Sequence, residues 1–110
     1  MDFYILNEND EPVIEKEIFT WSRWMGNSNR KIVAKETYKN LTISTVFLGM
    51  DHSWGRGQTP LLWETMVFGK DDSEEITERC SGTRKDALKM HNEVVERLKM
   101  NKRRYLWNRI

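Results

Sequence analysis

Hydrophobic and polar residues alternate along two segments in the middle of the chain, and this pattern predicts a β-hairpin. In residues 41–48, every second side chain falls on one face, and that face is apolar except for Thr45. Residues 61–68 are almost entirely apolar, which is typical of a central strand. Residues 50–60 would connect the two arms as a long loop.

A helical period appears on each side of this hairpin. The first predicted helix, over residues 13–25, has an apolar face formed by Ile14, Ile18, Trp21 and Met25. The second predicted helix runs from about residue 84 to residue 100. Thr83 and Asp86 have the spacing of a capping box at its start.

The remaining apolar runs predict further strands at residues 3–6, 31–40 and 74–81. Strands and helices do not alternate, which argues against a doubly wound parallel fold. We therefore expect an α+β fold with a four- or five-stranded, mainly antiparallel sheet and two helices packed on one face. The expected organisation is a single domain over residues 1–100, followed by a basic, aromatic C-terminal tail, residues 101–110.

Composition narrows the class of protein. A chain of 110 residues with five Trp and four Phe is long enough to bury one core. Its single cysteine, Cys80, cannot form an internal disulfide and suits a reducing compartment. The longest apolar run is far too short to span a membrane. We expect a cytoplasmic protein with no membrane association.

Charge is unevenly distributed although the formal net charge is only +1. Residues 1–17 carry six acidic side chains and one basic one, whereas residues 97–110 carry six basic side chains and no acidic one. The two ends could attract each other, or the basic end could meet an acidic partner.

The loop at residues 50–60 is the main candidate for function, because long ordered loops tend to carry it. Asp51 could orient the imidazole of His52 for binding or acid-base chemistry. Trp54 offers a stacking surface and Arg56 an anion contact. The alternative is that Asp51 and His52 only cap the turn and Trp54 packs on the sheet.

Glu64 and His91 are the other unusual polar positions. Glu64 interrupts an apolar strand, so it needs a basic partner or water. His91 lies on the apolar stripe of the second helix and is expected to be a hydrogen-bonded core histidine. A metal site using His52, His91 and either Asp51 or Cys80 is not expected, because no pair has ligand spacing. No cofactor is expected.

The basic tail suggests an alternative function, nucleic-acid binding, in which basic side chains contact phosphates and aromatic rings stack on bases. The residues that would do this are Arg103, Arg104, Tyr105, Trp107 and Arg109. The competing interpretation is a tail that packs on the domain or on a partner.

The central hairpin also carries a family resemblance. Its sequence, STVFLGMDHSWGRGQTPLLWETMVFG, follows a helix that contains WSRWM. This arrangement resembles a family of small bacteriophage and prophage proteins with no assigned activity. Their pattern has a Trp-x-x-Trp helix, a strand close to STVFLGLDH and a strand close to LLFETMVFG. An Ala and a His follow at the spacing of Ala87 and His91. The resemblance spans about residues 15–95.

The resemblance implies a phage accessory protein that binds a host factor and blocks it, for example a component of a defence system. We expect a binding protein rather than an enzyme. The expected binding residues are Arg23, Trp24, Asp51, His52, Trp54, Arg56, Glu64 and His91. A nucleotide-binding protein or small enzyme is a further alternative, in which Asp51, His52, Glu64 and His91 would converge in one pocket.

Overall fold

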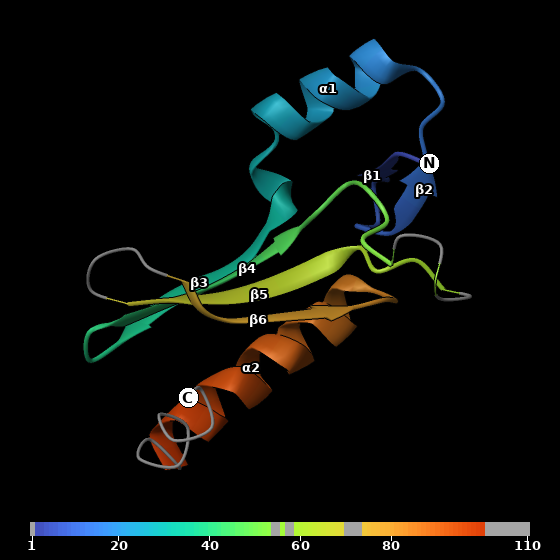
Figure 1. Cartoon of the computed structure of the whole chain (residues 1–110). Helices are drawn as coiled ribbons and strands as arrows, with labels where there is room; N and C mark the ends of the chain where they lie inside the picture. The colour runs from blue at the N-terminus through green and yellow to red at the C-terminus, as the bar shows by residue number, and fades with distance from the viewer. Residues whose placement is uncertain (1, 54–55, 57–58, 70–73, 101–110) are drawn as a thin grey trace.

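The computed structural model describes residues 2–53, 56, 59–69 and 74–100. In this part of the chain, two antiparallel sheets combine with two α-helices (Figure 1). The predicted α+β fold class is therefore confirmed.

The main sheet has four strands in the order β3-β4-β5-β6, so each strand pairs with its neighbour in the sequence. These strands are β3 (Ile32–Tyr38), β4 (Leu41–Phe47), β5 (Trp63–Phe68) and β6 (Glu74–Cys80). β4 and β5 are the two arms of the predicted hairpin, and their register places Thr45 opposite Thr65.

The helix α2 (Arg84–Met100) covers one face of this sheet (Figure 1). The predicted capping box forms at its start. The backbone N–H and the hydroxyl of Thr83 donate to Asp86 Oδ2 at 2.8 and 3.0 Å, and the Asp86 N–H donates to Thr83 Oγ1 at 3.3 Å. The two hydrogen bonds from Thr83 lower the pKa of Asp86, because they favour its carboxylate form.

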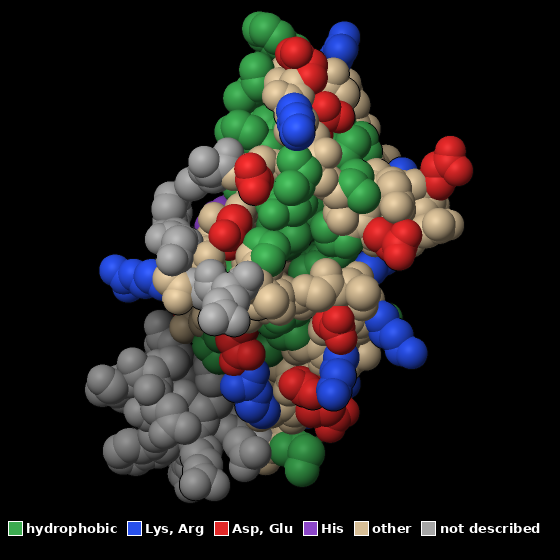
Figure 2. Space-filling model, turned by 90° about the vertical axis from the view of Figure 1, so that its right-hand side faces the viewer, with side chains coloured by type: hydrophobic (Ala, Val, Ile, Leu, Met, Phe, Trp, Pro, Cys, Tyr) green, Lys and Arg blue, Asp and Glu red, His purple; other side chains and the backbone are tan. Residues whose placement is uncertain are grey.

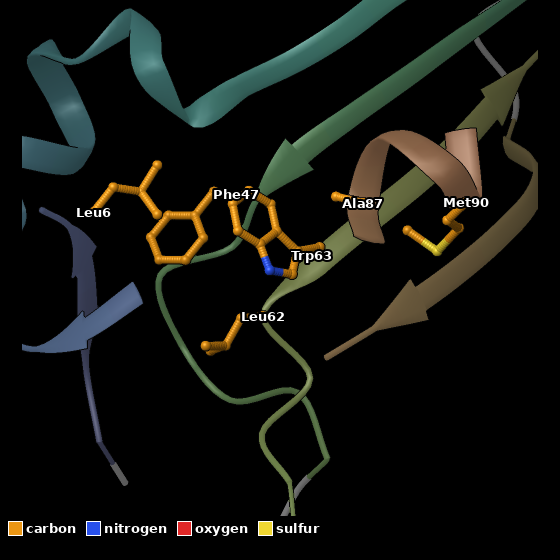
Figure 3. Close-up of a cluster of buried hydrophobic side chains, with 6 residues drawn as sticks. All are labelled: Leu6, Phe47, Leu62, Trp63, Ala87 and Met90. Carbon is orange, nitrogen blue, oxygen red and sulfur yellow. The ribbon is translucent and has the colours of Figure 1, made fainter. Parts of the chain in front are cut away.

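Two apolar clusters form the core. One contains Ile43, Val67, Val94, Val95 and Leu98. Figure 3 shows the other, in which Phe47 and Trp63 lie side by side, with Leu6 on one side of the pair and Ala87 of α2 on the other. The alternation predicted for residues 41–48 therefore places the correct face of β4 in the core.

A smaller N-terminal unit precedes the main sheet. It consists of the strands β1 (Tyr4–Leu6) and β2 (Pro12–Ile14), which pair with each other, and the helix α1 (Ile18–Asn27). A short 3₁₀ helix, η1 (Asn29–Lys31), leads from it into β3.

The prediction that the first helix starts at residue 13 is wrong, because α1 begins at Ile18. Residues 12–14 pair with β1 instead, with Val13 opposite Ile5. Glu17 then caps α1, and its side chain accepts a hydrogen bond from the backbone N–H of Phe19 at 3.2 Å.

The two helices reach the same core in different ways. α2 lies along the sheet, whereas α1 contacts the core with the side chains of Trp24 and Met25. Trp24 meets Phe47 edge-on, with 5.8 Å between the ring centroids. Most of the surface of α1 is therefore left without a sheet to cover it.

Candidate functional site

Asp51 begins the loop after β4, and its carboxylate accepts three hydrogen bonds from within the chain. Oδ1 accepts the backbone N–H groups of Ser53 at 2.8 Å and Leu61 at 2.9 Å. Oδ2 accepts the Ser53 hydroxyl at 2.8 Å. These bonds lower the pKa of Asp51, with the Ser53 backbone N–H contributing most. The ionised Asp51 carboxylate thus joins the two ends of the loop. Its hydrogen bonds to Ser53 and Leu61 are those of a residue that caps the turn.

The rest of the loop is described only in part. The ring nitrogen Nδ1 of His52 lies 3.0 Å from the carbonyl oxygen of Met50, so it donates its proton there. Arg56 is exposed. Trp54, which we predicted as a stacking surface, lies outside the described residues.

Glu64 has its basic partner on the next strand. Its Oε2 accepts a hydrogen bond from Arg79 Nε at 2.8 Å, and Glu64 itself is only 8% exposed. The register places Val46, Glu64 and Arg79 side by side on the face of the sheet away from α2. This pair explains how an apolar strand accommodates a carboxylate.

His91 lies on the other face and joins a buried polar network. Its Nδ1 is 2.7 Å from Thr45 Oγ1, which is 2.5 Å from Thr65 Oγ1. Its Nε2 is 2.7 Å from Glu36 Oε1. Because a carboxylate only accepts hydrogen bonds, Nε2 donates to Glu36, and in the neutral ring Nδ1 accepts from the Thr45 hydroxyl. The expected core histidine is observed.

This Thr-His-Glu arrangement has the connectivity of a hydrolase triad, but its hydroxyl cannot meet a substrate. Thr45 and Thr65 have no exposed surface, and His91 is 1% exposed beneath α2. A nucleophile must contact the bond that it attacks. The network therefore specifies how α2 sits on the sheet and explains the single polar residue on the core face of β4.

The structure does not gather the predicted polar residues into one site. Glu64 and His91 lie on opposite faces of the sheet, since Thr65, the next residue after Glu64, belongs to the His91 network. Asp51 binds within its own loop. Within the described ranges, no group of His, Cys, Asp and Glu could hold a metal ion. Burial, and then Asp86, raise the pKa of the Cys80 thiol, which disfavours its reactive thiolate.

The N-terminal unit is fastened to the main sheet at Gly49. Its carbonyl oxygen accepts hydrogen bonds from the indole N–H of Trp21 at 3.0 Å and from the backbone N–H of Tyr4 at 2.8 Å. The ring of Phe3 packs against that of Trp21 in a tilted arrangement, with 4.6 Å between the ring centroids. Trp21 therefore anchors the inner side of α1, as its place on the predicted apolar face suggested.

The N-terminal unit exposes four large apolar side chains at the end of β2 and the start of α1. Phe19 is 73% exposed, Ile14 is 52% exposed and Ile18 is 48% exposed, and Val13 is also exposed. We call Val13, Ile14, Ile18 and Phe19 the α1–β2 surface. Figure 2 shows a band of hydrophobic side chains that runs down from the level of α1 between acidic side chains.

The predicted apolar face of the first helix would bury Ile14 and Ile18, but both are exposed. Both residues fit the helical period, but residue 14 belongs to a strand and Ile18 is the first residue of α1. The signal that could have found the surface is the cluster of four apolar residues within an acidic stretch. Of the residues predicted on this helix, Arg23 is exposed and Trp24 is partly buried.

Charged residues around this surface are mostly acidic. Glu11, Glu15 and Glu17 flank its members in the sequence, and all three contribute to the excess of six acids over one base in residues 1–17. Glu15 and Glu17 also take part in the turn into α1, where Glu15 Oε2 accepts the Glu17 N–H at 3.1 Å. The surface is thus apolar, and its neighbours in the sequence are mostly acidic.

Comparisons with protein-family models, with curated proteins and with solved structures find no match to this chain. The resemblance to phage and prophage proteins therefore stays a prediction. Of the helices in the described ranges, neither is long and apolar enough to cross a membrane.

Proposed function

We propose that this protein acts by binding another protein through the α1–β2 surface. The observation that carries the proposal is the exposure of Phe19 and Ile18 on a helix that buries none of its residues completely. Exposed clusters of large apolar side chains with a polar rim are typical of interaction sites. A complementary partner would present an apolar patch bordered by Lys or Arg side chains.

The central loop has a supporting part in this proposal. Asp51 fixes the end of β4, and Gly49 beside it receives both α1 and β1. Gly49, just before the predicted loop, therefore holds the binding unit in place, and Asp51 closes the loop next to it. Arg56, which is exposed, remains a candidate contact.

The class of partner follows from the family resemblance. If the chain is a phage or prophage accessory protein, its partner is a bacterial host protein, and blocking that protein is its effect on the host. A cytoplasmic location agrees with this proposal, because the single cysteine has no need of an oxidising compartment.

Affinity capture from a bacterial host lysate tests the proposal. The full chain serves as bait, beside the double variant Ile18→Ser, Phe19→Ser. A captured protein should be lost with the double variant and should bind the purified wild-type chain directly. We expect at least a tenfold loss of affinity, since removal of two central apolar anchors typically costs several kcal/mol.

Leu88→Ser is the matched control. Leu88 is a 43% exposed apolar residue on the outer side of α2, outside the α1–β2 surface. It should leave capture unchanged. Equal binding of the wild-type chain and the double variant to every captured partner would contradict the proposed surface.

A further inference from the structure

We propose that the α1–β2 surface of one copy of this protein binds the C-terminal tail, residues 101–110, of a second copy. The inference rests on the proposed binding surface and adds its regulation, because a bound tail would compete with any other partner. Its first support is charge. The surface lies at the end of residues 1–17, which carry six acidic residues and one basic residue, and the tail carries four basic residues and no acidic one.

Apolar chemistry matches as well. The tail contains Tyr105, Leu106, Trp107 and Ile110 among its basic residues. An exposed ring such as that of Phe19 and an exposed aliphatic side chain such as that of Ile18 suit these groups. Aromatic residues together with Arg are the composition enriched at interface centres. The tail therefore has the chemistry expected of a partner for this surface.

Reach decides between the tail of the same chain and that of another copy. Figure 1 shows α1 and the C-terminal end of α2 at opposite ends of the molecule, whose longest extent is 45 Å. The tail starts after Met100, at that far end. Ten residues span at most about 36 Å when fully extended. If the tail crossed its own molecule, its whole length would be needed to reach the surface, and none would remain to bind there. The tail of a neighbouring copy can instead start next to the surface.

Exchange of tails between two copies would be reciprocal. Each copy has one surface and one tail. In a symmetric dimer, each tail therefore binds the surface of the other copy, and the same contact forms twice. Once one tail is bound, the second binding event is intramolecular and is strengthened by the high effective concentration. The dimer should weaken with salt, because charge attraction contributes to it.

Sedimentation equilibrium of the full chain, across a range of concentrations and at low and high salt, tests the inference. We expect a monomer–dimer equilibrium that weakens as salt increases. Either of two variants should weaken the dimer at least tenfold: Phe19→Asp in the surface, or Leu106→Ser with Trp107→Ser in the tail. Leu88→Ser is again the matched control and should dimerise like the wild type.

Mixing the two variants gives the sharper measurement. The tail variant keeps an intact surface, and the Phe19→Asp variant keeps an intact tail. A mixture should therefore form a mixed dimer through one contact, at concentrations at which each variant alone is mostly monomeric. Failure of the mixture to associate while the wild type dimerises would overturn the tail-to-surface contact.

Other results would also overturn it. A wild-type chain that is monomeric at every concentration excludes the exchange, and so does a tail variant that dimerises normally. Titration with a single-stranded oligonucleotide tests the alternative that the tail binds nucleic acid. Tail-dependent oligonucleotide binding by a monomeric chain would replace the inference with nucleic-acid binding. Capture of a separate protein through Phe19 would still support the proposed function in that case.

Discussion

Asp51 shows how one ionised residue can organise a loop. Its two oxygens receive the Ser53 backbone and hydroxyl and the Leu61 backbone, which lies at the opposite end of the loop. Protonation would remove acceptor capacity from the carboxylate. The connection between the strands should therefore depend on the charge of this single side chain.

Acid titration of stability tests this dependence. Because the pKa of Asp51 is lower in the folded state than in the unfolded state, its charge stabilises the fold above about pH 4, the ordinary pKa of Asp. That stabilisation is lost as pH falls through the lowered folded-state pKa. We expect Asp51→Asn to lower the urea midpoint at pH 7, and the gap from the wild type to shrink below pH 4. An unchanged gap would contradict the role of the charge.

Thr45 and His91 give a second prediction for single residues. Thr45→Val should leave the buried Nδ1 of His91 without its partner and destabilise the fold by about 1–3 kcal/mol. His91→Leu removes the same hydrogen bond from the other side. The double variant should be less destabilised than the sum of the two, because no buried group is then left unpaired by this bond. Urea unfolding of the four proteins measures the coupling, and strict additivity would refute it.

Among the elements, α1 depends on a close approach that only glycine allows. Gly49 has a φ of +74°, and a Cβ there would lie 2.6 Å from the Met25 sulfur and 3.1 Å from the Trp21 indole nitrogen. The Met25 side chain can move, but the backbone conformation remains unfavourable for other residues.

Gly49→Ala should therefore loosen the N-terminal unit. We expect a loss of about 1–2 kcal/mol in unfolding free energy from the backbone conformation alone. The variant should also change the fluorescence of Trp21, whose indole contacts Gly49. Gly26→Ala is the control, since nothing lies within 4 Å of a Cβ at that position. Similar effects of both substitutions would contradict the proposed contact.

The elements also show how far the sequence could lead. The bounds of α2 and its capping box were predictable, because they depend on a local period and on side chains three residues apart. The start of α1 was not, since Pro12–Ile14 became a strand by pairing with residues six to ten positions away. The partner of Glu64 required the register of β5 on β6, which places Arg79 beside it. The exposure of Phe19 depends on where α1 packs on the rest of the protein, and the hydrophobic period of the sequence does not indicate that position.

The whole molecule has two regions of different packing. In the larger one, α2 covers the sheet over both apolar clusters. The N-terminal unit attaches through Leu6, Trp24 and Met25 in one cluster and through Gly49, but α1 buries none of its residues completely. Regions with fewer buried contacts open more easily than the core.

Native-state hydrogen exchange should resolve this difference. We expect amides of β4 and β5 to exchange at free energies close to that of global unfolding, and amides of α1 and β1 to exchange at lower free energies. Binding of a partner to the α1–β2 surface should slow exchange in α1. Uniform protection across both regions would contradict the division.

The strand order β3-β4-β5-β6 also bears on how the chain reaches this structure. Every strand in the sheet pairs with the next one along the sequence, so the sheet can assemble from successive hairpins without waiting for distant segments to meet. Such local topology favours rapid folding. The slowest closure should be that of residues 48–62, the longest connection between neighbouring strands in the sheet. The hydrogen bond between Asp51 and Leu61 holds the two ends of this loop together and should favour its closure. A side chain first considered for chemistry thus becomes a candidate for setting the folding rate.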